Sequence, residues 1–194
     1  MTEKNPIHIL AVEDSPATGT SLSAFISMFG CVPSIETNAE DALKKLESGY
    51  LPDIIILDFK LPRMSGTTFL NLLRKSAKWK DIPVIPFTSQ AHAYEKTGLD
   101  ESKKLLDEFY KSLFFNKCVS GAPIEPYEKP DGNPNTKEIP MELAISIAVM
   151  LIYKNLPLPH KLEKHIHHKT HMTPEIFQEN AKIILDKLKN LRTS

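Results

Sequence analysis

Short runs of β-branched residues and leucine alternate with helical patterns over the first ninety residues, and this alternation restricts the fold more than any other feature. Residues 54–57 form a continuous apolar run, and residues 7–12 form another that is apolar except for His8. Such runs are typical of strands covered on both faces of a parallel sheet. Residues 82–88 form a third run, which Pro83 and Pro86 interrupt, and residues 31–36 form a weaker fourth. Helical patterns lie between these runs, at residues 17–29, 39–48 and 67–78.

Strands that alternate with helices in this way build βαβ units, so we predict an α/β fold with a doubly wound parallel sheet. Thr37 and Glu40 have the spacing of a capping box for the second helix. In the third helix Phe69, Leu70, Leu72 and Leu73 are expected to share one buried face.

The composition is that of an ordinary globular protein. The 194 residues include 24 basic and 24 acidic side chains, so a net charge of zero gives no general attraction to nucleic acid or to an anionic membrane. The two cysteines, Cys31 and Cys118, are too few for a disulfide framework and are interpreted as reduced packing residues. The N-terminus has no signal-peptide pattern and the longest apolar run, residues 139–153, is too short to cross a bilayer. We therefore expect a cytoplasmic protein without a membrane partner.

Three carboxylates directly follow predicted strands, and their positions predict a site that binds a ligand or carries out a reaction. Glu13 and Asp14 come after the first strand, and Asp58 follows the strand at 54–57. Parallel strands present their carboxyl ends at one edge, so these side chains should converge there and repel one another. A divalent cation relieves that repulsion, and hard oxygen ligands suit Mg²⁺. With the Thr88 hydroxyl and the Lys129 ammonium near the same edge, the group would suit a phosphoryl group, with Asp58 as the nucleophile.

Three segments carry a resemblance to a known family. ILAVEDSP at 9–16, IIILDFKLPRMSG at 54–66 and IPVIPFTSQ at 82–90 resemble the receiver domain of two-component response regulators. The acidic pair, the phospho-acceptor aspartate, the switch hydroxyl and the Leu-Pro-x-Met-x-Gly loop of that family are all matched. The separations also match, with 44 residues from Asp14 to Asp58 and 30 from Asp58 to Thr88.

The resemblance implies a flavodoxin-like receiver fold with five parallel strands in the order 2-1-3-4-5. It also implies that Asp58 accepts a phosphoryl group from a sensor histidine kinase or a phosphotransfer protein. Mg²⁺ would be held by Glu13, Asp14, Asp58 and the backbone carbonyl of Lys60. Thr88 would then hydrogen-bond the new phosphate, and the protein would be a phospho-acceptor rather than an enzyme.

The second half departs from the family pattern. Lys129, in GAPIEPYEKP at 121–130, is the preferred active-site lysine, and Lys111 is its rival. Preferring Lys129 requires an elongated helix-four region, so we expect an insertion at about 91–120 and a Pro-rich segment at 123–140. Pro86 removes a ladder donor from a strand expected to be internal, so we also expect the pairing of the fourth and fifth strands to be short or irregular. The predicted receiver domain covers residues 5–154. Residues 155–194 are expected to form a helical C-terminal extension that is packed on the receiver or linked to it. Helices are predicted at residues 141–154 and 174–191, the second with Thr173 as its N-cap and Pro174 at its first position.

Several functional alternatives stay open at this point. A phosphorylated receiver would pass its signal by contact with a downstream protein, and it could form a homodimer through the helix-four to helix-five region. Alternatively, the chain is a degenerate receiver that acts as a docking module, or a regulator whose extension binds nucleic acid, although a tail charge of only +3 disfavours the latter. The His-rich segment at 160–171 is interpreted as a weakly basic surface rather than a metal site.

Overall fold

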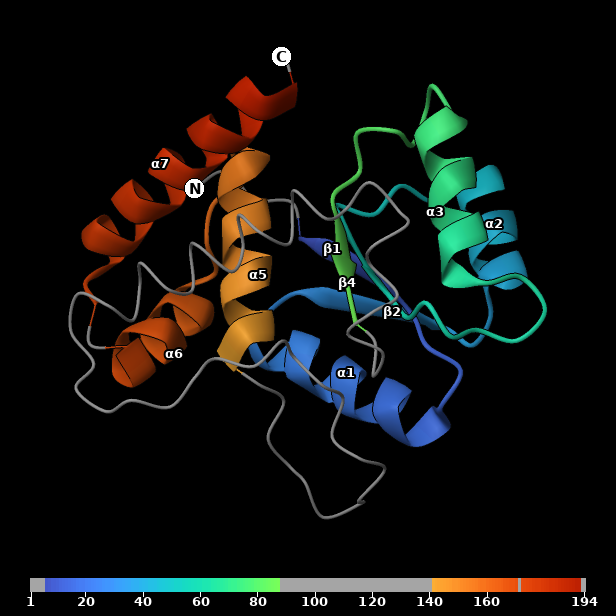
Figure 1. Ribbon diagram of the computed structural model, residues 1–194. Coiled ribbons are helices and arrows are strands. Elements are labelled where there is room, and N and C mark those ends of the chain that lie inside the picture. Colours follow the sequence, from blue (N-terminus) through green and yellow to red (C-terminus); the bar gives the residue numbers. More distant parts are fainter. Residues whose placement is uncertain (1–5, 88–140, 171, 193–194) are drawn as a thin grey trace. The chain divides into compact units, whose positions relative to one another are not determined.

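The computed structural model describes residues 6–87, 141–170 and 172–192, and these ranges belong to two compact units that divide between residues 87 and 141. The first unit is built on a parallel sheet with the strand order β2-β1-β3-β4 (Figure 1). Its strands are β1 (His8–Val12), β2 (Val32–Glu36), β3 (Ile54–Leu57) and β4 (Val84–Pro86). The described sheet thus has four strands rather than five, because the region expected to supply the fifth lies outside the described residues.

The central strands are the most buried ones. β1 pairs with β2 on one side and with β3 on the other, and the β1–β3 register places Ile9 opposite Ile54. The side chains from Ile9 to Val12 and from Ile54 to Leu57 are at most 1% exposed. β2 is half-buried, as expected for a strand that pairs on one side among the described strands. The continuous apolar runs therefore correspond to strands covered on both faces, as the sequence predicted.

Three helices connect these strands: α1 (Pro16–Met28), α2 (Ala39–Glu47) and α3 (Gly66–Lys75). α1 covers one face of the sheet, and α2 and α3 cover the other (Figure 1). This is the doubly wound arrangement that right-handed βαβ connections produce. In α3 the prediction was right for Phe69, Leu70 and Leu73, which are buried, but wrong for Leu72, which is 37% exposed.

The start of α2 differs from the predicted capping box. Asn38, and not Thr37, is the N-cap, since its side chain accepts a hydrogen bond of 2.9 Å from the backbone N–H of Asp41. The Asn38 amide also donates to the Asp41 carboxylate at 2.8 Å, and this bond, followed by that from Lys44, lowers the pKa of Asp41. Asn is as good an N-cap as Thr or better, so the cap moves by one residue. Glu40 is consequently not needed for the cap.

β4 is short, and its proline lies at its end. Pro86 lies opposite Leu57 in the register and has no backbone N–H to donate. The next residue, Phe87, donates its backbone N–H to the carbonyl of Leu57 at 2.8 Å. The predicted loss of a ladder donor at Pro86 is therefore limited to one position. The expectation of irregular pairing with a fifth strand concerns residues outside the described ones.

The second unit contains α5 (Met141–Tyr153), α6 (His160–Thr170) and α7 (Pro174–Arg192). Thr173 caps α7 as predicted, since its hydroxyl accepts from the N–H of Ile176 at 3.4 Å. α6 was not among the predicted helices. α5 is buried from Leu143 to Val149 and contacts both α6 and α7, so these two helices cover part of its surface. In the part of the chain that the structure describes, no helix combines the length and the apolar character that crossing a bilayer requires.

Cys31 gives a first testable prediction. Its side chain is 5% exposed, and burial, followed by the nearby Asp53 charge, raises the pKa of the thiol to about 11. Because the thiolate is the reactive form, we expect alkylation by iodoacetamide at pH 8 to be at least ~100-fold slower in the folded protein than in urea. The measurement uses a Cys118→Ser background, so that only Cys31 reacts. Comparable rates in both states would show that Cys31 is accessible.

Candidate functional site

The three carboxylates predicted to converge do lie together. Glu13, Asp14 and Asp58 each offer one oxygen, and these oxygens are all within 4.8 Å of one another. The Glu13 and Asp58 side chains are 1% and 2% exposed, whereas Asp14 is exposed. The cluster is thus open to solvent on the side of Asp14. Its position follows from the topology, because β1 and β3 are neighbours and end at the same edge of the sheet.

The backbone on both sides of the cluster continues the sheet for one more residue. The N–H of Glu13 donates to the carbonyl of Glu36 at 2.9 Å, and the N–H of Asp58 donates to the carbonyl of Val12 at 2.9 Å. The Glu13 carboxylate accepts from the N–H of Ser15 at 3.2 Å, and Ser15 in turn caps α1. Glu13 and Asp58 are therefore attached to the rigid part of the fold.

Asp58 begins the loop that leads from β3 to α3. One oxygen of its carboxylate, Oδ1, accepts the N–H of Lys60 at 3.0 Å, as the side chain of an aspartate often does at the start of a turn. The loop ends at Gly66, whose N–H donates to the carbonyl of Phe59 at 3.1 Å. We call residues 59–65 the acceptor loop. Both of its ends are thus tied to the backbone next to Asp58.

Gly66 lies against the backbone of Asp58 so closely that no side chain fits. A Cβ atom at this position would lie 2.1 Å from the carbonyl oxygen of Asp58 and 2.7 Å from the Cα of Phe59. Real Cβ atoms do not approach other atoms so closely. The glycine in the Leu-Pro-x-Met-x-Gly pattern is therefore required here by packing against the acceptor residue rather than by its φ angle.

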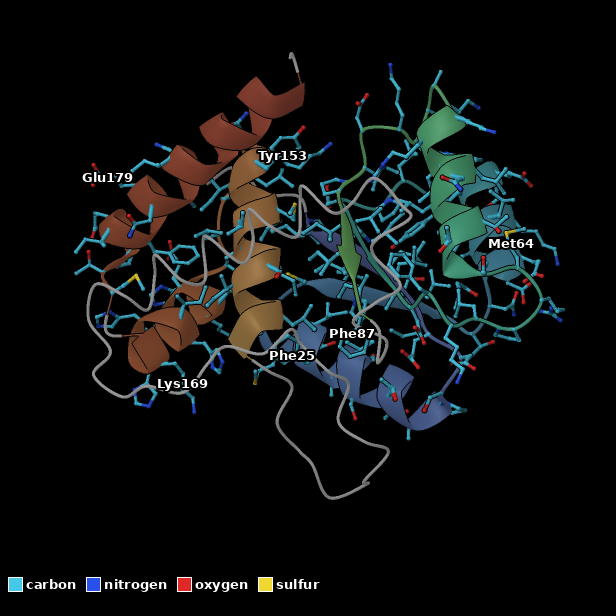
Figure 2. All side chains as sticks on the ribbon, in the orientation of Figure 1. Phe25, Met64, Phe87, Tyr153, Lys169 and Glu179 are labelled. Carbon is cyan, nitrogen blue, oxygen red and sulfur yellow. The ribbon has the colours of Figure 1, made fainter. Side chains whose placement is uncertain are left out.

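The middle of the acceptor loop is held from outside. Arg63 has φ 62°, a left-handed conformation that costs a non-glycine residue roughly 1 kcal/mol. Glu40, in the first turn of α2, accepts the N–H of Met64 at 3.2 Å, and its Oε1 lies 3.3 Å from Nε of Arg63. Figure 2 shows Met64 where α2 and α3 come together. The sequence carries no signal of this contact, because Glu40 and Met64 are 24 residues apart and not on one element.

The residues present fit a hard divalent cation. Three carboxylates with two of them buried would repel one another, and their oxygens are the ligand type that Mg²⁺ prefers. The exposed side at Asp14 leaves room for the water molecules that Mg²⁺ retains. The cluster therefore could hold one Mg²⁺ ion and leave a position for an oxygen of a further ligand.

Comparison with known proteins agrees with the geometry. Residues 9–102 match the family model described as "Response regulator receiver domain". This segment is a response regulator receiver domain. The receiver is 32% identical over 83 residues to the sensor histidine kinase CheAY of Helicobacter pylori, covering 42% of this chain and 10% of that protein. It is 33% identical over 86 residues to the response regulator Rre1 of Synechocystis, covering 44% of this chain and 37% of Rre1.

The matched region thus spans less than half of each of these two relatives. Among solved structures, the chemotaxis response regulator CheY4 of Vibrio cholerae matches with a TM-score of 0.46 and 24% identity. That match covers 50% of this chain and 80% of CheY4.

Several predicted site residues of the receiver lie outside the described part. Thr88, Lys129 and the rival Lys111 all fall between residues 88 and 140, so their roles stay predictions. Lys60 is described, and its side chain is exposed. Its backbone N–H is bonded to Asp58, while the role of its carbonyl as a metal ligand stays a prediction.

The His-rich segment is largely helical, as α6. Nδ1 of His167 lies 2.6 Å from the carbonyl oxygen of Met172, and His160 lies 3.9 Å from Glu163. Burial, followed by the charges of Lys169 and His168, lowers the pKa of His165. Over the described ranges, the carboxylate cluster of Glu13, Asp14 and Asp58 is the one group of three or more candidate ligands that could hold a metal ion. α6 therefore offers no such group among its described residues.

Proposed function

We propose that the protein is a phosphorylation-controlled switch of a two-component system and that Asp58 is its phospho-acceptor. The observation that carries the proposal is the meeting of Glu13, Asp14 and Asp58 within 4.8 Å, inside the segment that matches the receiver family. A buried carboxylate that is tied to the end of a central strand is held in one orientation, which favours attack on a phosphoryl group. The docking-module and nucleic-acid alternatives have no comparable support.

The chemistry of the proposal is an in-line transfer. An oxygen of the Asp58 carboxylate forms a bond to phosphorus while the bond between phosphorus and the imidazole nitrogen of a phosphohistidine breaks. The imidazole leaves with the bonding electron pair and takes up a proton, and Asp58 becomes an acyl phosphate. Mg²⁺, when bound by Glu13, Asp14, Asp58 and the Lys60 carbonyl, supplies positive charge that balances the oxygens of the phosphoryl group.

The proposal also gives roles to the other predicted site residues and to the partners. Thr88 would donate its hydroxyl to the phosphate, and Lys129 would pair with it. The donor is a histidine kinase or a phosphotransfer protein, and the signal would leave by contact with a downstream protein. In this proposal the chain is cytoplasmic and turns over no substrate other than its own phosphoryl group. Residues 5–154 would form the receiver, with a fifth strand in the sheet, and residues 155–194 the extension.

The proposed function is tested by incubating the full chain with acetyl phosphate and Mg²⁺ and measuring its intact mass. The expected result is the gain of one phosphoryl group that is lost on treatment with hydroxylamine, as an acyl phosphate should be. A chain that gains no mass, or that gains a group stable to hydroxylamine, would contradict the proposal.

Mg²⁺ binding itself gives a second prediction. A ligand present at 100 times its dissociation constant adds about 2.7 kcal/mol to the free energy of unfolding, so Mg²⁺ should raise the melting temperature by several degrees. Asp14→Asn should reduce this shift, because it removes the exposed ligand without disturbing a buried group. Asp81→Asn is the matched control, since Asp81 is also exposed but lies outside the cluster. Equal shifts in the two variants would place the Mg²⁺ site elsewhere.

A further inference from the structure

Glu40 joins two elements that are far apart in the sequence. Its Oε1 accepts the N–H of Met64 at 3.2 Å and lies 3.3 Å from Nε of Arg63. The Glu40 side chain is 29% exposed, whereas the Arg63 side chain is 65% exposed. One carboxylate oxygen of α2 therefore contacts both a backbone donor and a cation of the acceptor loop.

The helix that carries Glu40 does not need its carboxylate. The cap of α2 is Asn38, which bonds to the backbone and side chain of Asp41. Asp41 also pairs with Lys44 at 2.9 Å. The polar groups at the start of α2 thus satisfy one another, and the Glu40 carboxylate contacts the acceptor loop instead.

The acceptor loop needs such a contact, because its middle is in a conformation that a side chain rarely adopts. Arg63 has φ 62°, and the Glu40 carboxylate holds the guanidinium of Arg63 together with the next backbone N–H, that of Met64. Two residues further on, Gly66 touches the backbone of Asp58 and bonds to Phe59. A movement at residues 63 and 64 is therefore passed by a short, closely packed piece of backbone to Asp58.

We propose that Glu40 is a positioning residue for Asp58. It acts on Asp58 through its contacts with Arg63 and Met64 of the acceptor loop. This inference rests on the proposed function, since it concerns the reaction of Asp58. Loss of the Glu40 contact leaves Glu13 and Asp14 in place but lets the acceptor loop, and with it Asp58, occupy more than one position. A small displacement of a reacting group lowers the rate of reaction much more than it lowers stability.

The test compares the rates of phosphorylation by acetyl phosphate at saturating Mg²⁺, well below the melting temperature of every variant. Glu40→Ala removes both contacts, and we expect its rate to fall roughly tenfold. Glu40→Gln keeps an oxygen that accepts the Met64 N–H, and we expect it to stay within about threefold of the wild type. Glu47→Ala is the matched control, because Glu47 is an exposed glutamate at the other end of the same helix. Circular dichroism verifies that each variant is folded.

The outcomes separate the inference from the function on which it rests. The positioning role is supported if Glu40→Ala is folded but phosphorylated slowly, and if Glu40→Gln recovers the rate of phosphorylation. A general loss of folding would not be restored by the amide of glutamine. Equal rates for Glu40→Ala and Glu47→Ala, with a phosphorylated wild type, overturn the positioning role alone. A wild type that accepts no phosphoryl group overturns the proposed function, and the role of Glu40 with it.

Discussion

We expect Asp58→Asn to abolish the uptake of a phosphoryl group from acetyl phosphate, with no gain in intact mass under conditions in which the wild type should gain one. The reason is chemical, since the neutral amide oxygen of asparagine is a poor nucleophile and cannot yield an acyl phosphate. The structure makes this variant a clean one. The Asn side chain retains an oxygen at the position of Oδ1, which accepts the N–H of Lys60, so the start of the acceptor loop is preserved.

The melting temperature of Asp58→Asn separates a loss of reactivity from a loss of folding. The substitution removes one of three negative charges that lie within 4.8 Å, so the melting temperature without Mg²⁺ should be no lower than that of the wild type. Asp81→Asn serves as the control for a change from aspartate to asparagine on the surface, and it should accept a phosphoryl group normally. If Asp58→Asn still gained a phosphoryl group, the acceptor would be a different residue.

The sequence predicts the sheet and the carboxylate cluster because both depend on patterns within single strands. A strand buried on both faces must be apolar throughout, and residues 54–57 form β3 with the same bounds as predicted. The residue after such a strand lies at the carboxyl edge, so the sequence alone is enough to place Asp58 and Glu13 at that edge. Convergence then follows from the adjacency of β1 and β3, which is a property of the topology.

The contacts that the sequence did not predict depend on elements meeting in space. Glu40 has the spacing of a capping-box residue, but Asn38 takes the cap and leaves Glu40 to contact Met64, 24 residues further along the chain. α6 was overlooked because its four histidines and three lysines show little apolar periodicity, although Leu162 and Ile166 are buried. Leu72 fits the helical pattern of α3 but lies at the margin of the buried face. In each case contacts between elements decide the outcome, and the local sequence pattern does not show them.

Gly66→Ala should be the most destabilising single change near the site. A Cβ atom would lie 2.1 Å from the Asp58 carbonyl oxygen, and the atoms it meets belong to the backbone, which cannot rotate out of the way. Overpacking costs ~1–3 kcal/mol, so we expect a loss of about 3 kcal/mol in the free energy of unfolding, measured by urea denaturation. Alanine is the better helix former by about 1 kcal/mol, so intrinsic propensity alone would give a change of the opposite sign.

Gly30→Ala distinguishes this clash from the general effect of replacing a glycine. Gly30 has φ 79° and no atom within 4 Å of an added Cβ, so its substitution should cost only the ~1 kcal/mol of a left-handed alanine and leave phosphorylation unchanged. Gly66→Ala, in contrast, must move the backbone of Asp58 or the start of α3, so its folded fraction should also be phosphorylated more slowly. An equal loss of stability in both variants, with a normal rate for Gly66→Ala, would mean that the acceptor loop adapts without disturbing Asp58. A larger loss of stability in Gly66→Ala than in Gly30→Ala, together with slower phosphorylation, would show that the packing of Gly66 determines both the stability of the fold and the position of the Asp58 carboxylate.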